Sequence, residues 1–87
     1  MLIIQSFAGI RAAPRFVLDK TANQKEEKGV IRMKLTLTYE EIAQMIGTSR
    51  EIVTRVFSIF RKKNQVVIEG STLALRDKVG LERLVQN

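Results

Sequence analysis

One short stretch of the chain, residues 50–62, combines charged, hydroxyl and apolar side chains at helical spacing. At 100° per residue, the polar positions occupy one half of a helical wheel. They are Arg50, Glu51, Thr54, Arg55, Ser58, Arg61 and Lys62. An arginine can donate two hydrogen bonds to guanine, a glutamate can accept one from the cytosine amino group, and hydroxyls can bond to bases or phosphates. This half of the helix carries the chemistry that contacts with a major groove require.

The other half of the same helix is apolar, and we expect it to pack on the helix before it. Its residues are Ile52, Val53, Val56, Phe57, Ile59 and Phe60. The preceding helix offers Ile42, Ala43 and Ile46 for this contact, and the small Ala43 suits a close crossing of two helices. The polar half can also be read more simply, as a solvated face.

Two start signals for helices lie ten residues apart. Thr38 and Glu41 have the spacing of a capping box, and the pattern repeats at Thr48 and Glu51, directly after Gly47. We therefore predict helices over 39–46 and 49–63 with a tight turn at Gly47, which is a helix-turn-helix. Glu51 keeps two readings, as a base contact or as the capping-box carboxylate alone.

The segments around these helices predict a small sheet and two further helices. Alternation over 30–37 favours a strand, and 65–69 with 72–76 favours a hairpin around Gly70-Ser71, preceded by Asn64 in a left-handed cap. Asp77 can cap a last helix that runs through Leu84, and the polar residues 23–29 indicate a solvated loop.

Apolar side chains at helical spacing also mark residues 2–22, where Pro14 predicts either a helix start near 12–13 or a kink. The apolar run Leu2–Ile10 either covers the core of the domain itself or provides a surface for dimerisation.

Composition excludes several classes of function. The 87 residues include no Cys and no His, so disulfides, zinc fingers, thiolate nucleophiles and histidine catalysis are excluded. The carboxylates fall in caps, loops and solvent-facing positions, so we expect no catalytic residues, no metal site, no cofactor and no enzyme activity. We read neither a signal peptide nor a membrane span. The formal net charge of +6 indicates a polyanionic partner, nucleic acid before membrane.

Residues 37–60, LTYEEIAQMIGTSREIVTRVFSIF, resemble the helix-turn-helix signature of the CRP/FNR family of bacterial transcription regulators. The matching positions are Leu37-Thr38, Glu41-Ile42-Ala43, Met45-Ile46-Gly47, Ser49-Arg50-Glu51, Arg55, Phe57 and Phe60. The similarity continues more loosely over about residues 15–84. It implies an α+β fold, a winged helix-turn-helix over 15–87 that consists of a small helical bundle with a β-hairpin wing. Residues 1–14 are then an apolar segment that is a remnant of, or a substitute for, a dimerisation helix.

The resemblance also implies roles for individual residues. Arg50, Glu51 and Arg55 would read bases, while Thr38, Thr48, Ser49 and the wing residues Gly70, Ser71 and Thr72 would lie near phosphates. The polar half of helix 49–63 adds Thr54, Ser58, Arg61 and Lys62 as contacts to the backbone or the groove. Loop 23–29 falls where some activators of the family touch RNA polymerase.

Three departures from the family pattern accompany this match. Ile52 replaces the usual Thr or Ser, Asn64 replaces a common Gly, and these 87 residues contain no effector-binding domain. We therefore expect a cytoplasmic, nucleoid-associated homodimer that binds double-stranded DNA at a two-fold-symmetric operator and regulates transcription. The alternatives are a protein-interaction module, a restraining partner of a full-length regulator, and nucleic-acid binding without sequence preference.

Overall fold

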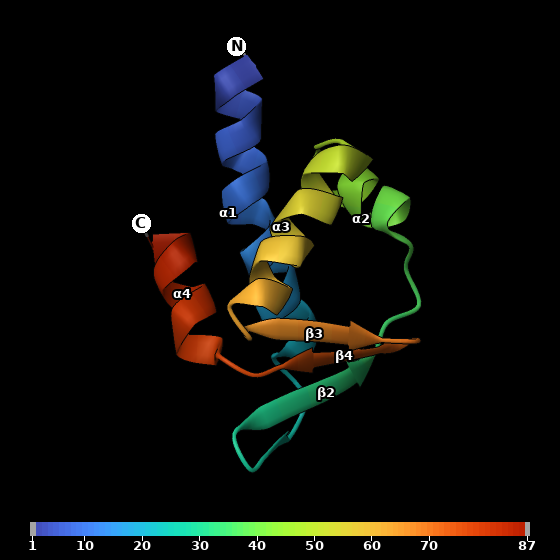
Figure 1. Cartoon of the computed structure of the whole chain (residues 1–87), viewed down its shortest axis with the longest axis vertical. Coiled ribbons are helices and arrows are strands. Elements are labelled where there is room, and N and C mark those ends of the chain that lie inside the picture. The colour runs from blue at the N-terminus through green and yellow to red at the C-terminus, as the bar shows by residue number, and fades with distance from the viewer. Residues whose placement is uncertain (1, 87) are drawn as a thin grey trace.

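Helices and short strands alternate along residues 2–86, the part of the chain that the structure, a computed structural model, describes; for residues 2–10 it describes the backbone only (Figure 1). The elements are α1 (Leu2–Thr21), β1 (Glu26–Glu27), β2 (Val30–Lys34), α2 (Tyr39–Ile46), α3 (Arg50–Lys62), β3 (Val66–Glu69), β4 (Thr72–Leu75) and α4 (Lys78–Gln86). This arrangement confirms the expected α+β winged helix-turn-helix.

Helix α1 runs through Pro14, where the sequence predicts either a helix start or a kink. The alternative of a helix start near residues 12–13 is therefore wrong. A proline inside a helix cannot donate a hydrogen bond to the carbonyl four residues earlier. Burial offsets this loss, because Pro14 and Val17 are fully buried and Ala13 and Phe16 nearly so. The helix also continues across the expected boundary between residues 14 and 15.

Helix α2 has the predicted bounds because both of its ends are fixed locally. The Thr38 hydroxyl accepts from the Glu41 N–H at 3.2 Å, and the Glu41 carboxylate accepts from the Thr38 N–H at 2.8 Å. The predicted capping box is therefore confirmed. Gly47 ends the helix in the left-handed region at φ 77°, a conformation that costs glycine little.

Helix α3 begins one residue later than the second Thr-x-x-Glu pattern predicts. The N-cap is Ser49, whose hydroxyl accepts from the Ile52 N–H at 3.3 Å, so the expected cap at Thr48 is wrong. Thr48 still belongs to the end of α2, since its N–H donates to the Ala43 carbonyl at 2.9 Å. At the other end of α3, Asn64 takes the left-handed conformation that the sequence predicts, with φ 59°.

The four strands form an antiparallel sheet in the order β1-β2-β4-β3. Glu69 pairs with Thr72, so the hairpin turns at Gly70-Ser71 as predicted, and each of its strands is one residue shorter than expected. Strand β2 ends at Lys34 rather than at residue 37. The expected loop 23–29 is exposed throughout but contains the short strand β1, which pairs with β2.

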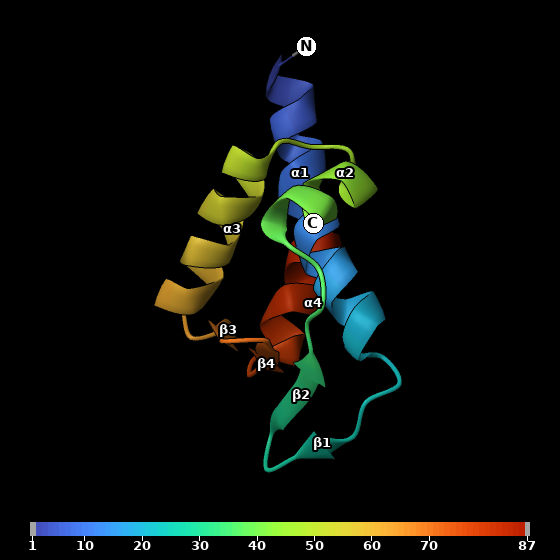
Figure 2. The same cartoon turned by 90° about the vertical axis from the view of Figure 1, so that its right-hand side faces the viewer.

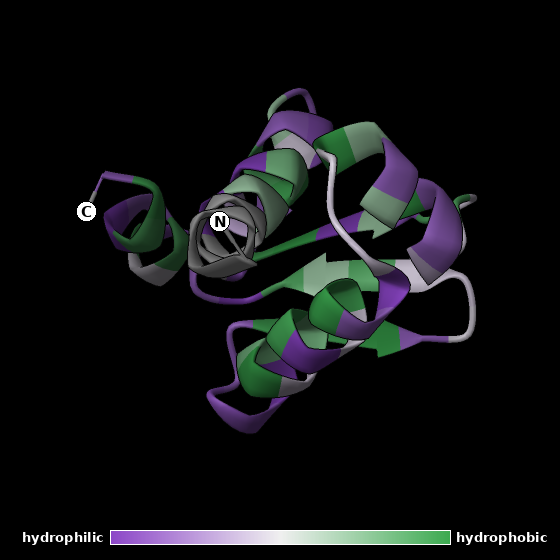
Figure 3. Cartoon of the chain, turned by 90° about the horizontal axis from the view of Figure 1, so that it is seen from above, coloured by the Kyte–Doolittle hydropathy of each residue, from purple (hydrophilic) through white to green (hydrophobic). Residues whose placement is uncertain are grey.

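The core lies where the four helices and the sheet meet. Phe60, Ile42, Leu73, Leu75 and Leu81 are almost completely buried. Figure 3 shows hydrophobic and hydrophilic residues in alternating bands along α2, α3 and α4, as helices with one buried face require.

A cap and a pair of backbone hydrogen bonds hold the start of α4. Asp77 accepts from the Gly80 N–H at 3.1 Å, which confirms the predicted cap. The Gln65 carbonyl, directly before β3, accepts from the Arg76 and Asp77 N–H groups, so it ties the start of β3 to the segment that leads into α4.

Candidate nucleic-acid interface

The outward side of α3 gathers most of the side chains that the sequence singled out. Seven residues line one open hollow there, and we call this set the outer face of α3: Arg50, Glu51, Thr54, Arg55, Ser58, Ile59 and Lys62. The set holds three cations and one carboxylate, so it is net positive. Figure 2 shows α3 along one side of the molecule, with α1 and α2 lying to the other side of it. Apart from the half-buried Ser58, the residues of the outer face are exposed, whereas Val53, Val56, Phe57 and Phe60 on the other side of the helix are buried.

The three predicted base-reading residues are brought together on this face. Arg50, Glu51 and Arg55 are all exposed and all line the hollow. Arg50 is the first residue of α3, directly after its Ser49 cap. A helix N-terminus carries free amides and a partial positive charge, which attract anions such as phosphate.

The one-residue shift in the cap changes what Glu51 can do. With Ser49 as the N-cap, Glu51 is the second residue of α3 and Ile52 is the third. The third position supplies the carboxylate of a capping box, and an isoleucine cannot supply one. The reading of Glu51 as a capping-box carboxylate is therefore wrong, and its exposed side chain lines the same hollow as Arg55.

Ile59 belongs to the apolar half of the predicted helix, and the structure places it on the outer face instead. Its side chain is 43% exposed, whereas Val53, Val56, Phe57 and Phe60 are buried. Ile52 lies between these extremes and packs against the edge of the core. The buried arc of α3 is thus narrower than the wheel predicts, and an apolar side chain stands among the charged ones.

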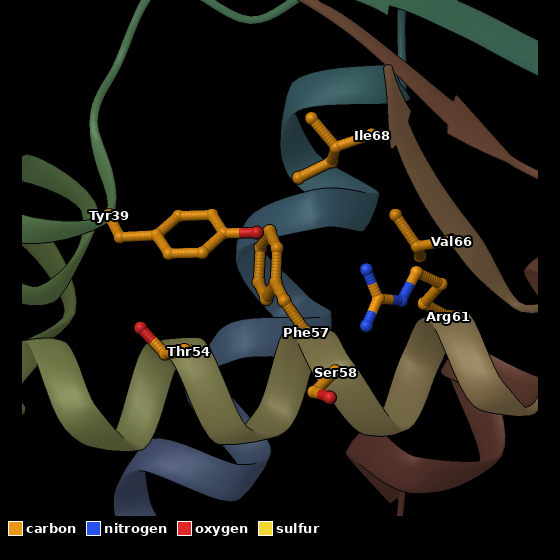
Figure 4. A pocket seen from close by; sticks show the side chains of 7 residues that line it. All are labelled: Tyr39, Thr54, Phe57, Ser58, Arg61, Val66 and Ile68. Carbon is orange, nitrogen blue, oxygen red and sulfur yellow. The ribbon is translucent and has the colours of Figure 1, made fainter. Parts of the chain in front are cut away.

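Arg61 is the helix residue that the structure separates from this group. It lines a second cavity of about 190 Å³ beside α3, which we call the side hollow. The lining comes from α2, α3 and β3 and consists of Tyr39, Thr54, Phe57, Ser58, Arg61, Val66 and Ile68 (Figure 4). Thr54 and Ser58 border both hollows, so the two surfaces are continuous. Sequence reasoning missed Tyr39, because a lone aromatic residue at a helix start gives no signal of a site.

The expected phosphate-contacting residues fall on two further elements. Thr38 and Ser49 are exposed caps of α2 and α3, and Thr48 is half-buried in the turn between these helices. Gly70, Ser71 and Thr72 form the exposed turn of the hairpin. The Ser71 carbonyl accepts from the Leu35 N–H at 2.6 Å, which ties this turn to the segment that leads to Thr38. Figure 1 shows the turn and that segment at the same edge of the molecule.

The loop predicted to touch RNA polymerase lies away from these residues. Figure 2 shows β1, within loop 23–29, at the end of the molecule opposite the turn between α2 and α3. The side chains of the Leu2–Ile10 run lie outside those that the structure describes, so both readings of that run stay predictions.

Metal-binding clusters and membrane-spanning helices are both missing from the described part of the chain. Its side chains include no group of three or more acidic residues placed to hold a metal ion. None of the helices within residues 2–86 combines the length and the apolar character that crossing a membrane requires.

Comparison with known sequences gives a consistent set of relatives. Residues 14–84 match the Crp-like helix-turn-helix domain family. Over 58 residues, 67% of this chain, the sequence is 36% identical to the CRP-like cAMP-activated global transcriptional regulator of Mycobacterium tuberculosis. The chain spans about a quarter of the length of that relative, 26%.

Comparison with solved structures leads to the same group of proteins. The CO-dependent transcription factor CooA from Carboxydothermus hydrogenoformans has a TM-score of 0.73 and 29% identity, covering 90% of this chain and 36% of its own. A CRP/FNR-family transcriptional regulator from Thermus thermophilus has a TM-score of 0.66 and 28% identity, covering 92% of this chain and 40% of its own. Oxidised CprK in complex with o-chlorophenolacetic acid has a TM-score of 0.85 at 14% identity, covering 97% of this chain and 36% of its own, which shows the shared fold alone.

Proposed function

Because the chain belongs to the Crp-like helix-turn-helix domain family, we propose that it binds double-stranded DNA sequence-specifically, as the DNA-binding part of a transcription regulator. The observation that carries this proposal is the outer face of α3, where Arg50, Glu51 and Arg55 are exposed together at the start of a helix. The tight turn at Gly47 and the Ser49 cap fix the start of α3 relative to α2.

In this proposal, α3 enters the major groove with its N-terminal half. Arg50 and Arg55 donate paired hydrogen bonds to guanines, and Glu51 accepts a hydrogen bond from a cytosine amino group. Contacts to bases specify the sequence, while contacts to phosphates fix the register of the protein on the duplex.

Phosphate contacts come from the elements around the recognition helix. Thr38, Thr48 and Ser49 lie at the starts of α2 and α3, and Lys62 extends from the last turn of α3. The hairpin wing, with Gly70, Ser71 and Thr72 at its turn, lies against the sugar-phosphate backbone. The formal net charge of +6 attracts the protein as a whole to the polyanionic DNA.

The proposal extends to partners that a regulator of this family requires. We infer that two copies bind a two-fold-symmetric operator as a homodimer, with their recognition helices about 34–36 Å apart so that they meet successive major grooves. Loop 23–29 then offers a contact to RNA polymerase, on the cytoplasmic nucleoid where transcription occurs.

Alanine substitution of the two arginines tests the proposal. Arg50→Ala or Arg55→Ala is expected to cost roughly 1–3 kcal/mol of binding free energy on a duplex selected from a random library, and to relax base preference at one position. Arg83→Ala on α4 removes the same charge from a helix that packs on α1, and serves as the matched control. Equal losses on selected and random duplexes would instead assign the arginines to phosphates.

A further inference from the structure

The side hollow lies between the recognition helix and the wing and has a distinctive chemical layout. Its volume of about 190 Å³ is several times the roughly 30 Å³ that one water occupies in the liquid, so it can admit a polyatomic group. Polar atoms come from the Tyr39, Thr54 and Ser58 hydroxyls and the Arg61 guanidinium. Phe57, Val66 and Ile68 supply apolar walls.

Two of the polar groups are directed at the same aromatic ring. In the view of Figure 4, the Tyr39 hydroxyl and the Arg61 guanidinium approach the Phe57 ring from opposite sides. Phe57 itself is buried, with 4% of its surface exposed, so it forms a fixed wall. The hollow thus presents one charged donor and one neutral donor beside the same apolar wall.

The position of Tyr39 is fixed by its neighbours on two sides. Its ring packs edge-on against Phe57, with 5.3 Å between the ring centroids and 68° between the planes. It is also the first residue of α2, next to the Thr38 capping box. A donor that is already held in place loses little conformational entropy on binding.

We propose that the side hollow binds one phosphodiester of the DNA backbone, with Arg61 as its charged donor and Tyr39 Oη as its neutral donor. This inference rests on the proposed function, because it requires α3 in the groove and the wing on the backbone. Arginine, tyrosine, serine and threonine side chains are the usual donors to DNA phosphates. Hydrogen bonds in which donor or acceptor is ionised are about twice as strong as neutral ones.

The apolar walls favour a phosphodiester over free phosphate. A phosphate within DNA carries deoxyribose carbons on both sides, and these carbons can pack on the half-buried Ile68 at the strand edge of the hollow. Free inorganic phosphate has no carbon to place there. The hollow lies between α3, proposed to enter the groove, and the wing, proposed to lie on the backbone, which suits it to fixing register rather than to reading sequence.

A methylphosphonate scan tests the inference. The duplex selected from a random library is made with one neutral methylphosphonate at each backbone position in turn, and binding is measured for wild type, Arg61→Ala, Tyr39→Phe and Arg83→Ala. We expect one position per half-site at which the wild type and Arg83→Ala lose about tenfold in affinity. Arg61→Ala should lose about tenfold on the unmodified duplex, show no further loss at that position and have a salt slope lower by about one.

Tyr39→Phe separates a hydrogen bond from a structural role. Phenylalanine keeps the ring that packs on Phe57 and removes only the hydroxyl, so thermal stability should stay unchanged while affinity falls roughly two- to tenfold. The remaining methylphosphonate effect at the assigned position should shrink by a similar factor.

Several results would overturn the inference. One is that the wild type binds DNA sequence-selectively, yet Arg61→Ala abolishes the affinity loss caused by a methylphosphonate at no backbone position. Another is Arg61-dependent binding of inorganic phosphate at millimolar concentration that leaves DNA binding unaffected. If the wild type itself shows no sequence-selective binding, the proposed function is overturned, and this inference with it.

Discussion

The starts of α2 and α3 carry the same four-residue pattern, yet they are built differently. At α2, Thr38 and Glu41 exchange two hydrogen bonds in a closed capping box. At α3, Thr48 and Glu51 have the same spacing, but Ser49 is the cap and accepts a single hydrogen bond. The Glu41 carboxylate accepts a hydrogen bond at the start of its own helix, whereas the Glu51 side chain lines the hollow on the outer face of α3.

The difference arises from what comes before each pattern. An irregular segment leads to Thr38, so nothing competes for its backbone groups. Thr48 follows Gly47, and its N–H closes the end of α2 on the Ala43 carbonyl. A local motif therefore gives a different structure when its first residue is already used by the preceding helix, and here the shift leaves a carboxylate available for DNA.

The left-handed turn at Gly47 should have the largest effect on this arrangement. Gly47→Ala is expected to lower the free energy of unfolding by about 1–2 kcal/mol, because an L side chain is strained at φ 77°. A Cβ there would meet no atom within 4 Å, so backbone strain is the whole cost. Urea unfolding measures it, with Gly47→Asn as the control, since asparagine tolerates this conformation better. Equal losses for the two variants would contradict this explanation.

Substitutions of the residues at the cap of α3 should have the next largest effect on stability. Ser49→Ala should cost about 1 kcal/mol of unfolding free energy, as the loss of an N-cap usually does. Thr48→Ala should cost less than about 0.5 kcal/mol, because the Thr48 contact to Ala43 uses its backbone N–H. Thermal unfolding of the two variants compares them directly. A larger loss for Thr48→Ala would place the cap at Thr48 after all.

The two glutamates should show the smallest difference in stability. Both alanine variants lose a favourable charge in the first turn of a helix, but Glu41→Ala also loses the 2.8 Å hydrogen bond from the Thr38 N–H. We expect Glu41→Ala to be less stable than Glu51→Ala by about 0.5–1 kcal/mol. In DNA selections the order should reverse, with only Glu51→Ala changing the preferred base. A changed preference in both variants would assign the effect to fold rather than to contact.

Local signals explain which parts of the fold the sequence predicts well. Helix α2 has the predicted bounds because a capping box and a left-handed glycine both lie within it or next to it. The pairing of β2 with β4, such as Ile31 opposite Leu75, joins residues more than forty positions apart, and no local pattern encodes it. Strand β1 escapes prediction because its two residues are charged and exposed. Burial of Pro14 in the core allows α1 to continue where propensity predicts a start or a kink.

In the candidate site, too, local patterns predict some residues, and contacts between distant elements decide the others. A helical wheel groups Arg50, Glu51 and Arg55 because it depends only on the geometry of one helix. It cannot place Ile59, which lies at the edge of the apolar half, since exposure there depends on what packs beside the helix. Nor can it find Tyr39, which reaches the side hollow from a different helix and forms a site only with β3.

Selection from a randomised duplex library at near-physiological salt tests the central claim most directly. The protein as it stands is incubated with the library, and the retained duplexes are sequenced. We predict an enriched inverted repeat with half-site centres about one helical turn apart, which a two-fold dimer of recognition helices requires. Binding without enrichment that disappears as salt rises would contradict the account, because it would leave charge as the only contribution to recognition.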